Sequence, residues 1–217
     1  CRSATSCCRG CAREVAGIRF ANPVLLASGT AGYGRELLGV ADLSCLGGLV
    51  TKAVSLAPRA GNAAPRVAEF HGGMLNSIGL ANPGAAPVAR DELPWLLANV
   101  RGPQVLVNVV GFTIEEYAEV IARLESVSGH AGYELNLSCP NTPAGGVEFG
   151  ADPDSVRAVV SRCRAATTRP LFAKLSPALP DIPAIAAVAH DAGADGLTLV
   201  NTMPGFLFDG GAPRLGN

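Results

Sequence analysis

The 217-residue sequence predicts an α/β fold: a TIM-type (β/α)8 barrel with only about the first six β/α units present. Six apolar segments alternate with helical patterns, which is typical of a parallel sheet covered by helices. Each apolar segment ends in polar side chains. The strand ends of a barrel meet at one face, whereas an open doubly wound sheet would spread them too widely for one small ligand. A complete barrel typically takes about 250 residues, so we expect the chain to be truncated at its C-terminus.

Composition excludes several classes of partner. The chain is 48% hydrophobic and 16% charged, with a net charge of -1. The absence of a basic run argues against nucleic acid and anionic membranes as partners, and no apolar stretch approaches the length of a membrane span. We expect a cytoplasmic enzyme. Residues 1–14 are predicted to be a Cys/Arg-rich, disordered leader, and residues 15–217 the barrel domain. The alternative for the leader is a zinc or iron–sulfur site, because Cys8 and Cys11 have ligand-like spacing.

The elements follow in order along the chain. Strands are expected as short apolar runs at 24–29, 48–53, 104–110, 171–175 and 196–200. A further strand is expected to begin at residue 133. Helices are expected at 34–46, 87–100, 113–126 and 183–192. A further helix is expected to begin at residue 152. Thr113 with Glu116 forms a capping-box pattern, and Asp152 precedes a proline at the first helical position. The Gly/Pro-rich segment 54–84 is too long for an idle connection and is predicted to be a functional loop.

The most informative stretch is 133–142, which begins as an apolar strand and ends in small polar groups around a thiol. Asn136 and Ser138 share a face by the two-residue period of a strand. Cys139 falls where strand becomes loop, and Pro140 stiffens the exit. This is how a fold presents reactive groups. The other central cysteines, Cys45 and Cys163, are expected to be buried on helices as small hydrophobes.

Two further patterns concern basic side chains. Only two of the 17 basic residues are lysines, Lys52 and Lys174, and both come near the ends of apolar strands. A compact ammonium there can contact an anionic ring or a phosphate. The histidines, His71, His130 and His190, match no motif and lack metal-ligand spacing. We expect surface or hydrogen-bonded structural histidines and no metal site.

An ordered set of blocks resembles the dihydroorotate dehydrogenases of family 1, from about residue 15 to 217. The blocks are Asn22-Pro23 with 27–30, Thr51-Lys52-Ala53, 76–84, 136–141 and Asn201-Thr202. The segments 51–54 and 72–79 resemble the NAD-linked, two-subunit class 1B catalytic subunit in particular. Cys139 supports that resemblance, because the membrane-bound class carries serine at this position.

The resemblance implies an FMN-binding enzyme of pyrimidine (UMP) biosynthesis that oxidises (S)-dihydroorotate to orotate, with Cys139 as the base and hydride transfer to flavin N5. It also implies a homodimer and a partner subunit that carries FAD and an iron–sulfur cluster. The implied substrate contacts are Lys52, Asn76, Ser77, Ile78, Gly79, Leu80, Asn136, Asn141, Asn201 and Thr202. The implied FMN contacts are Ser28, Thr51, Lys52, Asn108, Asn136, Lys174 and Val200.

Three other functions remain open from the sequence. A Schiff-base aldolase could use Lys174 as nucleophile, but it leaves Cys139 and the asparagines unexplained. A related dihydropyrimidine dehydrogenase could act on uracil, but Lys52 has the charge to pair with an orotate carboxylate. The third is an inactive barrel fragment that cannot hold FMN.

Overall fold

The computed structural model describes residues 11–138, 140–141, 147–209 and 212–216, and its centre is a six-stranded parallel sheet. The strand order is β12-β11-β8-β7-β4-β3, so each strand pairs with the next strand of this sheet along the chain. The strands are β3 (Leu25–Leu26), β4 (Gly48–Val50), β7 (Gln104–Val109), β8 (Gly132–Asn136), β11 (Leu171–Lys174) and β12 (Gly196–Thr198).

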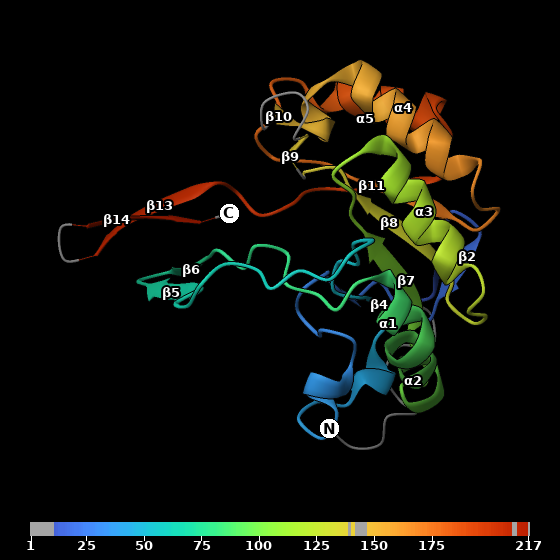
Figure 1. Cartoon of the computed structure of the whole chain (residues 1–217). Helices are drawn as coiled ribbons and strands as arrows, with labels where there is room; N and C mark the ends of the chain where they lie inside the picture. Colours follow the sequence, from blue (N-terminus) through green and yellow to red (C-terminus); the bar gives the residue numbers. More distant parts are fainter. Residues whose placement is uncertain (1–10, 139, 142–146, 210–211, 217) are drawn as a thin grey trace.

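This order confirms the predicted partial TIM barrel. A doubly wound sheet reverses its strand order at a switch point, and this sheet does not. The longer helices lie together on one side of the sheet (Figure 1). They are α2 (Leu93–Asn99), α3 (Ile114–Leu124), α4 (Pro153–Arg164) and α5 (Ile182–Asp191).

Alternation along the strands separates an apolar face from a polar one. Leu49, Val107, Leu135 and Ala173 belong to the main buried core, which the helices complete. The residues between them face the barrel interior, as the two-residue strand period requires. The caps predicted at Thr113 and Asp152 are confirmed, since each accepts a hydrogen bond from a backbone N–H in the first turn of α3 or α4. Glu116 accepts from the backbone N–H of Phe112 rather than from that of Thr113, so the reciprocal half of the capping box is shifted by one residue. Asp181, which was not predicted, caps α5 in the same way.

A short hairpin packs against the amino-terminal half of the barrel interior. It consists of β1 (Arg13–Val15) and β2 (Ile18–Phe20), which pair antiparallel. Ile18 and Phe20 form a second buried cluster with Val50, Leu106 and Phe172. This apolar layer leaves the carboxyl ends of the strands as the polar part of the interior. Of the predicted leader, residues 1–10 lie outside the described residues.

The predicted helix at 87–100 is present but is divided. It consists of α1 (Ala85–Pro87), a π-helical turn η4 (Val88–Glu92) and α2. The amide of Leu93 donates to the carbonyl of Val88, five residues earlier. Pro94 has no N–H to bond to the carbonyl four residues before it, which accounts for an irregular register at this point.

The predicted helix at 34–46 is wrong. The chain forms two 3-10 turns there, η2 (Arg35–Leu37) and η3 (Leu43–Cys45), separated by Gly39 at φ 88°. A left-handed glycine ends helical propagation. Cys45 is exposed on η3 rather than buried, whereas Cys163 is buried on α4 as expected.

Two hairpins that were not predicted project from the carboxyl side of the sheet (Figure 1). The first, β5 (Val67–Phe70) with β6 (Gly73–Asn76), lies inside the predicted functional loop; the second is β13 (Gly205–Asp209) with β14 (Ala212–Gly216). β6 contacts both β13 and β14. A small ladder, β9 (Pro140–Asn141) with β10 (Val147–Glu148), leads into the 3-10 turn η5 (Phe149–Ala151).

Across the described ranges, no helix has both the length and the apolar character needed to span a membrane. The same residues contain no group of three or more His, Cys, Asp or Glu side chains arranged to hold a metal ion.

Candidate active site at the carboxyl ends of the strands

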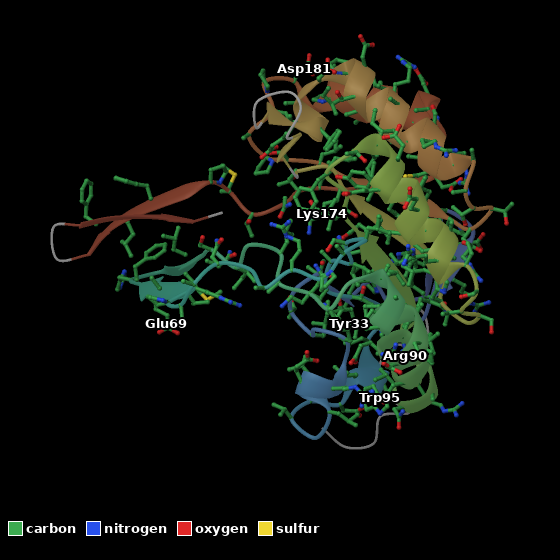
Figure 2. All side chains as sticks on the ribbon, in the orientation of Figure 1. Tyr33, Glu69, Arg90, Trp95, Lys174 and Asp181 are labelled. Carbon is green, nitrogen blue, oxygen red and sulfur yellow. The ribbon has the colours of Figure 1, made fainter. Side chains whose placement is uncertain are left out.

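Strand register brings polar side chains from four strands together inside the barrel. Asn108 on β7 pairs with Glu134 on β8, and one level higher Asn136 pairs with Lys174 on β11, which pairs with Thr198 on β12. Paired residues of a parallel sheet point to the same side, so these five side chains share one face. Figure 2 shows Lys174 near the carboxyl end of the sheet, on the side from which the hairpins project.

Glu134 is the centre of this cluster. Its side chain is only 2% exposed, and its two oxygens accept hydrogen bonds of 2.7 Å each from Asn108 Nδ2 and Thr198 Oγ1. Lys174 Nζ lies 4.0 Å from Glu134 Oε1. The sequence prediction missed Glu134 and Thr198. The available signal was a carboxylate inside an otherwise apolar strand, two residues before Asn136 and therefore on the same face.

Asn108 connects the cluster to the neighbouring strand. Its backbone N–H donates to Thr51 Oγ1 over 3.2 Å, and the Thr51 hydroxyl donates to the carbonyl of Lys52. The Oδ1 atom of Asn108 is buried and accepts no hydrogen bond within the described part of the chain. Because a buried polar atom is rarely left unpaired, this acceptor indicates a missing donor on the interior side.

Asn136 is held from two directions. The Tyr117 hydroxyl, from α3, donates to its backbone carbonyl over 2.7 Å, and Asn201 Nδ2 donates to its Oδ1 over 3.1 Å. Asn201 Oδ1 in turn accepts from the backbone N–H of Thr202. Asn136 and Asn201, which were predicted separately as substrate contacts, are therefore in direct contact.

The segment after β4 is fixed by backbone and phenol contacts. The backbone N–H of Lys52 donates to the carbonyl of Gly32, and the Tyr33 hydroxyl donates to the carbonyl of Ala53. Burial, with Glu92 and Glu36 adding to it, raises the pKa of Tyr33, so the phenol remains a neutral donor. The Lys52 side chain is half-buried.

The predicted substrate loop, 76–80, is anchored by a residue that the sequence prediction did not select. Asn82 Oδ1 accepts from the backbone N–H groups of Ser55 and Gly84, and Asn82 Nδ2 donates to Ser55 Oγ and to the carbonyl of Leu80. Leu80 packs against Ala53 and Val110. One buried amide thus ties the loop to the segment after β4, which carries Lys52.

Next to this loop is a groove of about 560 Å³ between the two hairpins. Asn76 and Thr202 line it, together with apolar residues of β6 and β13 that include Met74 and Phe206. The groove thus brings together one predicted substrate residue from each of two distant chain segments.

The remaining predicted residues are placed as follows. Ser28 follows the edge strand β3, and Val200 follows the opposite edge strand β12, so the predicted cofactor contacts are spread across the whole curled sheet. Ser77, Ile78 and Gly79 are half-buried in the loop. Asn141 is described only by its backbone pairing in β9. Cys139 lies outside the described residues.

The fold and this site define a partial (β/α)8 barrel with amides, a lysine and a carboxylate gathered at the strand ends. The family model described as Dihydroorotate dehydrogenase matches residues 11–209, so the chain belongs to the dihydroorotate dehydrogenase family.

Curated relatives agree with this assignment. The chain is 49% identical over 195 residues to the dihydroorotate dehydrogenase B (NAD(+)) catalytic subunit of Citrifermentans bemidjiense, covering 90% of this chain and 63% of that protein. It is 47% identical over 205 residues to the subunit of the same name from Desulforudis audaxviator, covering 94% of this chain and 66% of that protein. The chain therefore spans slightly less than two thirds of the length of each of these relatives.

Among solved structures, the fold is similar to that of DHODH from Eimeria tenella, solved in complex with ferulenol. The TM-score is 0.74 at 22% sequence identity, covering 91% of this chain and 61% of that chain. At this identity the likeness supports the barrel fold alone.

Proposed function

We propose that this chain is the FMN-binding catalytic subunit of an NAD-linked dihydroorotate dehydrogenase, which oxidises (S)-dihydroorotate to orotate in pyrimidine biosynthesis. The observation that carries the proposal is the contact network of Asn108, Glu134, Asn136, Lys174 and Asn201 at the strand ends, in a chain of this family. Membership in the family supports this reaction, and the network contains groups suited to it.

The residues present fit a flavin. The ring carries an N–H donor and several acceptor atoms along its pyrimidine edge. Asn108 Oδ1 is a buried acceptor lacking a donor in the described structure, and Lys174 supplies an ammonium that can stabilise a reduced, anionic ring. The proposed FMN contacts are Ser28, Thr51, Lys52, Asn108, Asn136, Lys174 and Val200.

Bound FMN would supply the hydride acceptor that the side chains themselves lack. The chain's own groups bind and orient the substrate. Asparagine amides offer both a donor and an acceptor to a pyrimidine ring, and Lys52 is the proposed partner of the substrate carboxylate. The proposed substrate contacts are Lys52, Asn76, Ser77, Ile78, Gly79, Leu80, Asn136, Asn141, Asn201 and Thr202.

Cys139 is the proposed base. Oxidation removes a proton from C5 of dihydroorotate as hydride leaves C6, so the base must accept that C5 proton. A thiol can do so as its thiolate. In the sequence Cys139 comes three residues after Asn136, the last residue of β8, between Ser138 and Pro140.

The proposal extends to assembly. The curated relatives are named catalytic subunits, which supports a separate partner subunit. We propose that this partner carries FAD and an iron–sulfur cluster and passes electrons to NAD, and that the catalytic subunit is a homodimer located in the cytoplasm. The domain proposal remains a leader at 1–14, whose last two residues, Arg13 and Glu14, begin β1, and an FMN-binding barrel at 15–217.

The test is an anaerobic absorption spectrum of the purified chain after addition of FMN. The expected result is a bound flavin band that bleaches when dihydroorotate is added. Absence of bound flavin, or a band that dihydroorotate leaves unchanged, would contradict the proposal and favour the inactive fragment. Faster bleaching by dihydrouracil than by dihydroorotate would favour the related dihydropyrimidine dehydrogenase.

A base assignment needs a matched pair of variants. Cys139→Ser should still bind FMN but should slow bleaching by dihydroorotate about a hundredfold or more at neutral pH, because a hydroxyl is a poorer base than a thiolate. Cys45→Ser changes an exposed thiol on η3 and should leave the rate unchanged. Equal rates for the two variants would exclude Cys139 as the base.

A further inference from the structure

Glu134 is a buried carboxylate to which the proposed function assigns no contact with FMN or substrate. It lies in the middle of β8, is 2% exposed, and faces the barrel interior, where its strand partners Asn108 and Phe172 are uncharged and Lys174 stands one level higher. Burying a carboxylate is costly unless it is hydrogen-bonded and balanced by an opposite charge. Glu134 has both compensations, which indicates a role beyond filling the core.

Its hydrogen bonds dictate the orientation of Asn108. An ionised carboxylate accepts hydrogen bonds and donates none, so the Asn108 amide must turn its Nδ2 toward Glu134 Oε1, at 2.7 Å. The opposite end of the amide, Oδ1, is then presented as an acceptor with no partner among the described residues. Thr198 is oriented in the same way, because its hydroxyl proton is committed to Glu134 Oε2.

Its charge also bears on Lys174. The Nζ–Oε1 separation is 4.0 Å, and the two side chains are 9% and 2% exposed, so their attraction is poorly screened by water. The pairing places the ammonium beside the level of Asn136, at the carboxyl end of β11. Glu134 therefore opposes part of the positive charge that Lys174 presents to the interior.

We propose that Glu134 is a positioning residue that fixes the Asn108 amide and the Lys174 ammonium, and thereby sets how strongly the site favours reduced over oxidised FMN. This inference rests on the proposed function for its redox consequence. Replacing the carboxylate by a neutral amide removes a negative charge close to Lys174. The anionic reduced flavin should then be favoured, because the lysine's charge is no longer offset.

The experiment compares Glu134→Gln with Glu125→Gln in the full 217-residue chain. Glu125 is a carboxylate hydrogen-bonded to Thr167, and it serves as the matched control because it belongs to a separate cluster with Arg169. E134Q should shift the ratio of the dissociation constants for oxidised and reduced FMN about tenfold toward the reduced form. That is a shift of about +30 mV for a two-electron couple. E125Q should leave the potential unchanged. An unchanged potential in E134Q would overturn the inference while leaving the proposed function intact.

A second variant separates charge from packing. Thr198→Val removes one donor to Glu134 but leaves its charge in place. We expect its flavin potential to remain close to that of the unaltered chain. A shift in T198V as large as that in E134Q would overturn the assignment of the effect to the carboxylate charge.

A third measurement needs no flavin. Lys52 and Lys174 are the two lysines of the sequence, so a chain labelled at lysine Cε gives two NMR lines, which Lys52→Arg assigns. E134Q should displace the Lys174 line and leave the Lys52 line in place. In the unaltered chain, the Asn108 Nδ2 protons should exchange with solvent far more slowly than those of exposed Asn99.

These outcomes distinguish the positioning role of Glu134 from the proposed FMN-dependent function. A displaced Lys174 line with slow Asn108 exchange, in a chain that binds no FMN, would support the positioning role and contradict the proposed function. An undisplaced line, or Asn108 exchange as fast as that of Asn99, would overturn the positioning role whatever the flavin does.

Discussion

Asn201 and Asn136 are 65 residues apart in the sequence, and Asn201 Nδ2 donates to Asn136 Oδ1 over 3.1 Å. The contact joins the segment after β12, at one edge of the sheet, to the central strand β8 across β11. This hydrogen bond determines which atom of each side-chain amide remains free to bind a ligand. Asn136 keeps its Nδ2 for a ligand, and Asn201 Oδ1 is already bonded to the backbone N–H of Thr202.

Asn201→Ala should therefore weaken substrate binding. We expect a KM for dihydroorotate raised about fivefold, since a hydrogen bond of about 1 kcal/mol is lost and the Asn136 amide is freed to rotate. Steady-state rates with a dye acceptor measure this. The control is Asn99→Ala, at the exposed end of α2, whose side chain bonds only locally to Trp95 in the described structure. A KM in N201A equal to that in N99A would contradict the prediction.

Tyr117→Phe tests the support beneath Asn136. The Tyr117 ring is buried and stacks edge-on against Phe149, which phenylalanine preserves. Its hydroxyl donates to the Asn136 carbonyl over 2.7 Å, and removing it leaves that buried carbonyl without this partner. We expect a loss of about 1–3 kcal/mol in the free energy of unfolding, measured by urea titration. A change below about 0.5 kcal/mol would show that the bond is not maintained in solution.

Asn82→Ala should release the substrate loop. Asn82 bonds to Ser55, Leu80 and Gly84, so the change removes several buried hydrogen bonds at once. We expect a loss of about 2–4 kcal/mol in unfolding free energy. Hydrogen exchange should increase in residues 76–84 more than in β7 or β8. Equal increases throughout the sheet would instead indicate general destabilisation.

The fourth prediction concerns pH. His130 is buried, its ring packs edge-on against Tyr133, and neither ring nitrogen has a hydrogen-bond partner among the described residues. The expectation of a surface or hydrogen-bonded histidine is therefore wrong for His130. Burial and then the nearby Arg169 lower the pKa of His130 to about 4, although Glu125 acts in the opposite direction.

Protonation of His130 therefore opposes folding. The unfolded chain takes up a proton on His130 near pH 6.5 and the folded chain only near pH 4, so stability is full above pH 6.5 and falls as the pH is lowered between these values. From pH 7 to pH 5 we expect a loss of about 2 kcal/mol. Urea titrations at the two pH values measure it.

His130→Phe keeps an aromatic ring and should flatten this dependence. The control is His190→Gln, because His190 is exposed on α5. The lowered pKa of Glu125 adds a separate loss that begins only near pH 4.5, below the window used. A pH dependence in H130F as steep as in the unaltered chain would assign the loss to other groups.

Elements with a strong local pattern were predicted well. The helices that begin at Thr113 and Asp152 carry their own cap signals, and the strands around Val107 and Leu135 are mostly apolar runs of five or six residues. Such signals depend on neighbours in the sequence, so one sequence suffices to locate them. The region at 34–46 failed because Gly39 breaks a pattern that is helical only on average.

The hairpins were missed for a different reason. β5–β6 and β13–β14 project away from the sheet, and exposed side chains such as Phe70, Met74 and Phe208 alternate weakly with polar ones. Without a buried face, a strand has little period-two signal. Their pairing depends on backbone hydrogen bonds and on mutual contact, which no local pattern records.

The sequence by itself determined the class of fold, the strand ends that carry polar groups, and the motif residues Lys52, Asn136, Lys174 and Asn201. Tertiary structure decided how these groups are connected. The role of Glu134 and Thr198 depends on the register of strands β7, β8, β11 and β12, and the role of Asn82 depends on the folding of loop 76–84 against Ser55. A buried carboxylate or amide is defined by the donors and acceptors around it. Those partners come from distant parts of the chain, and only folding brings them together.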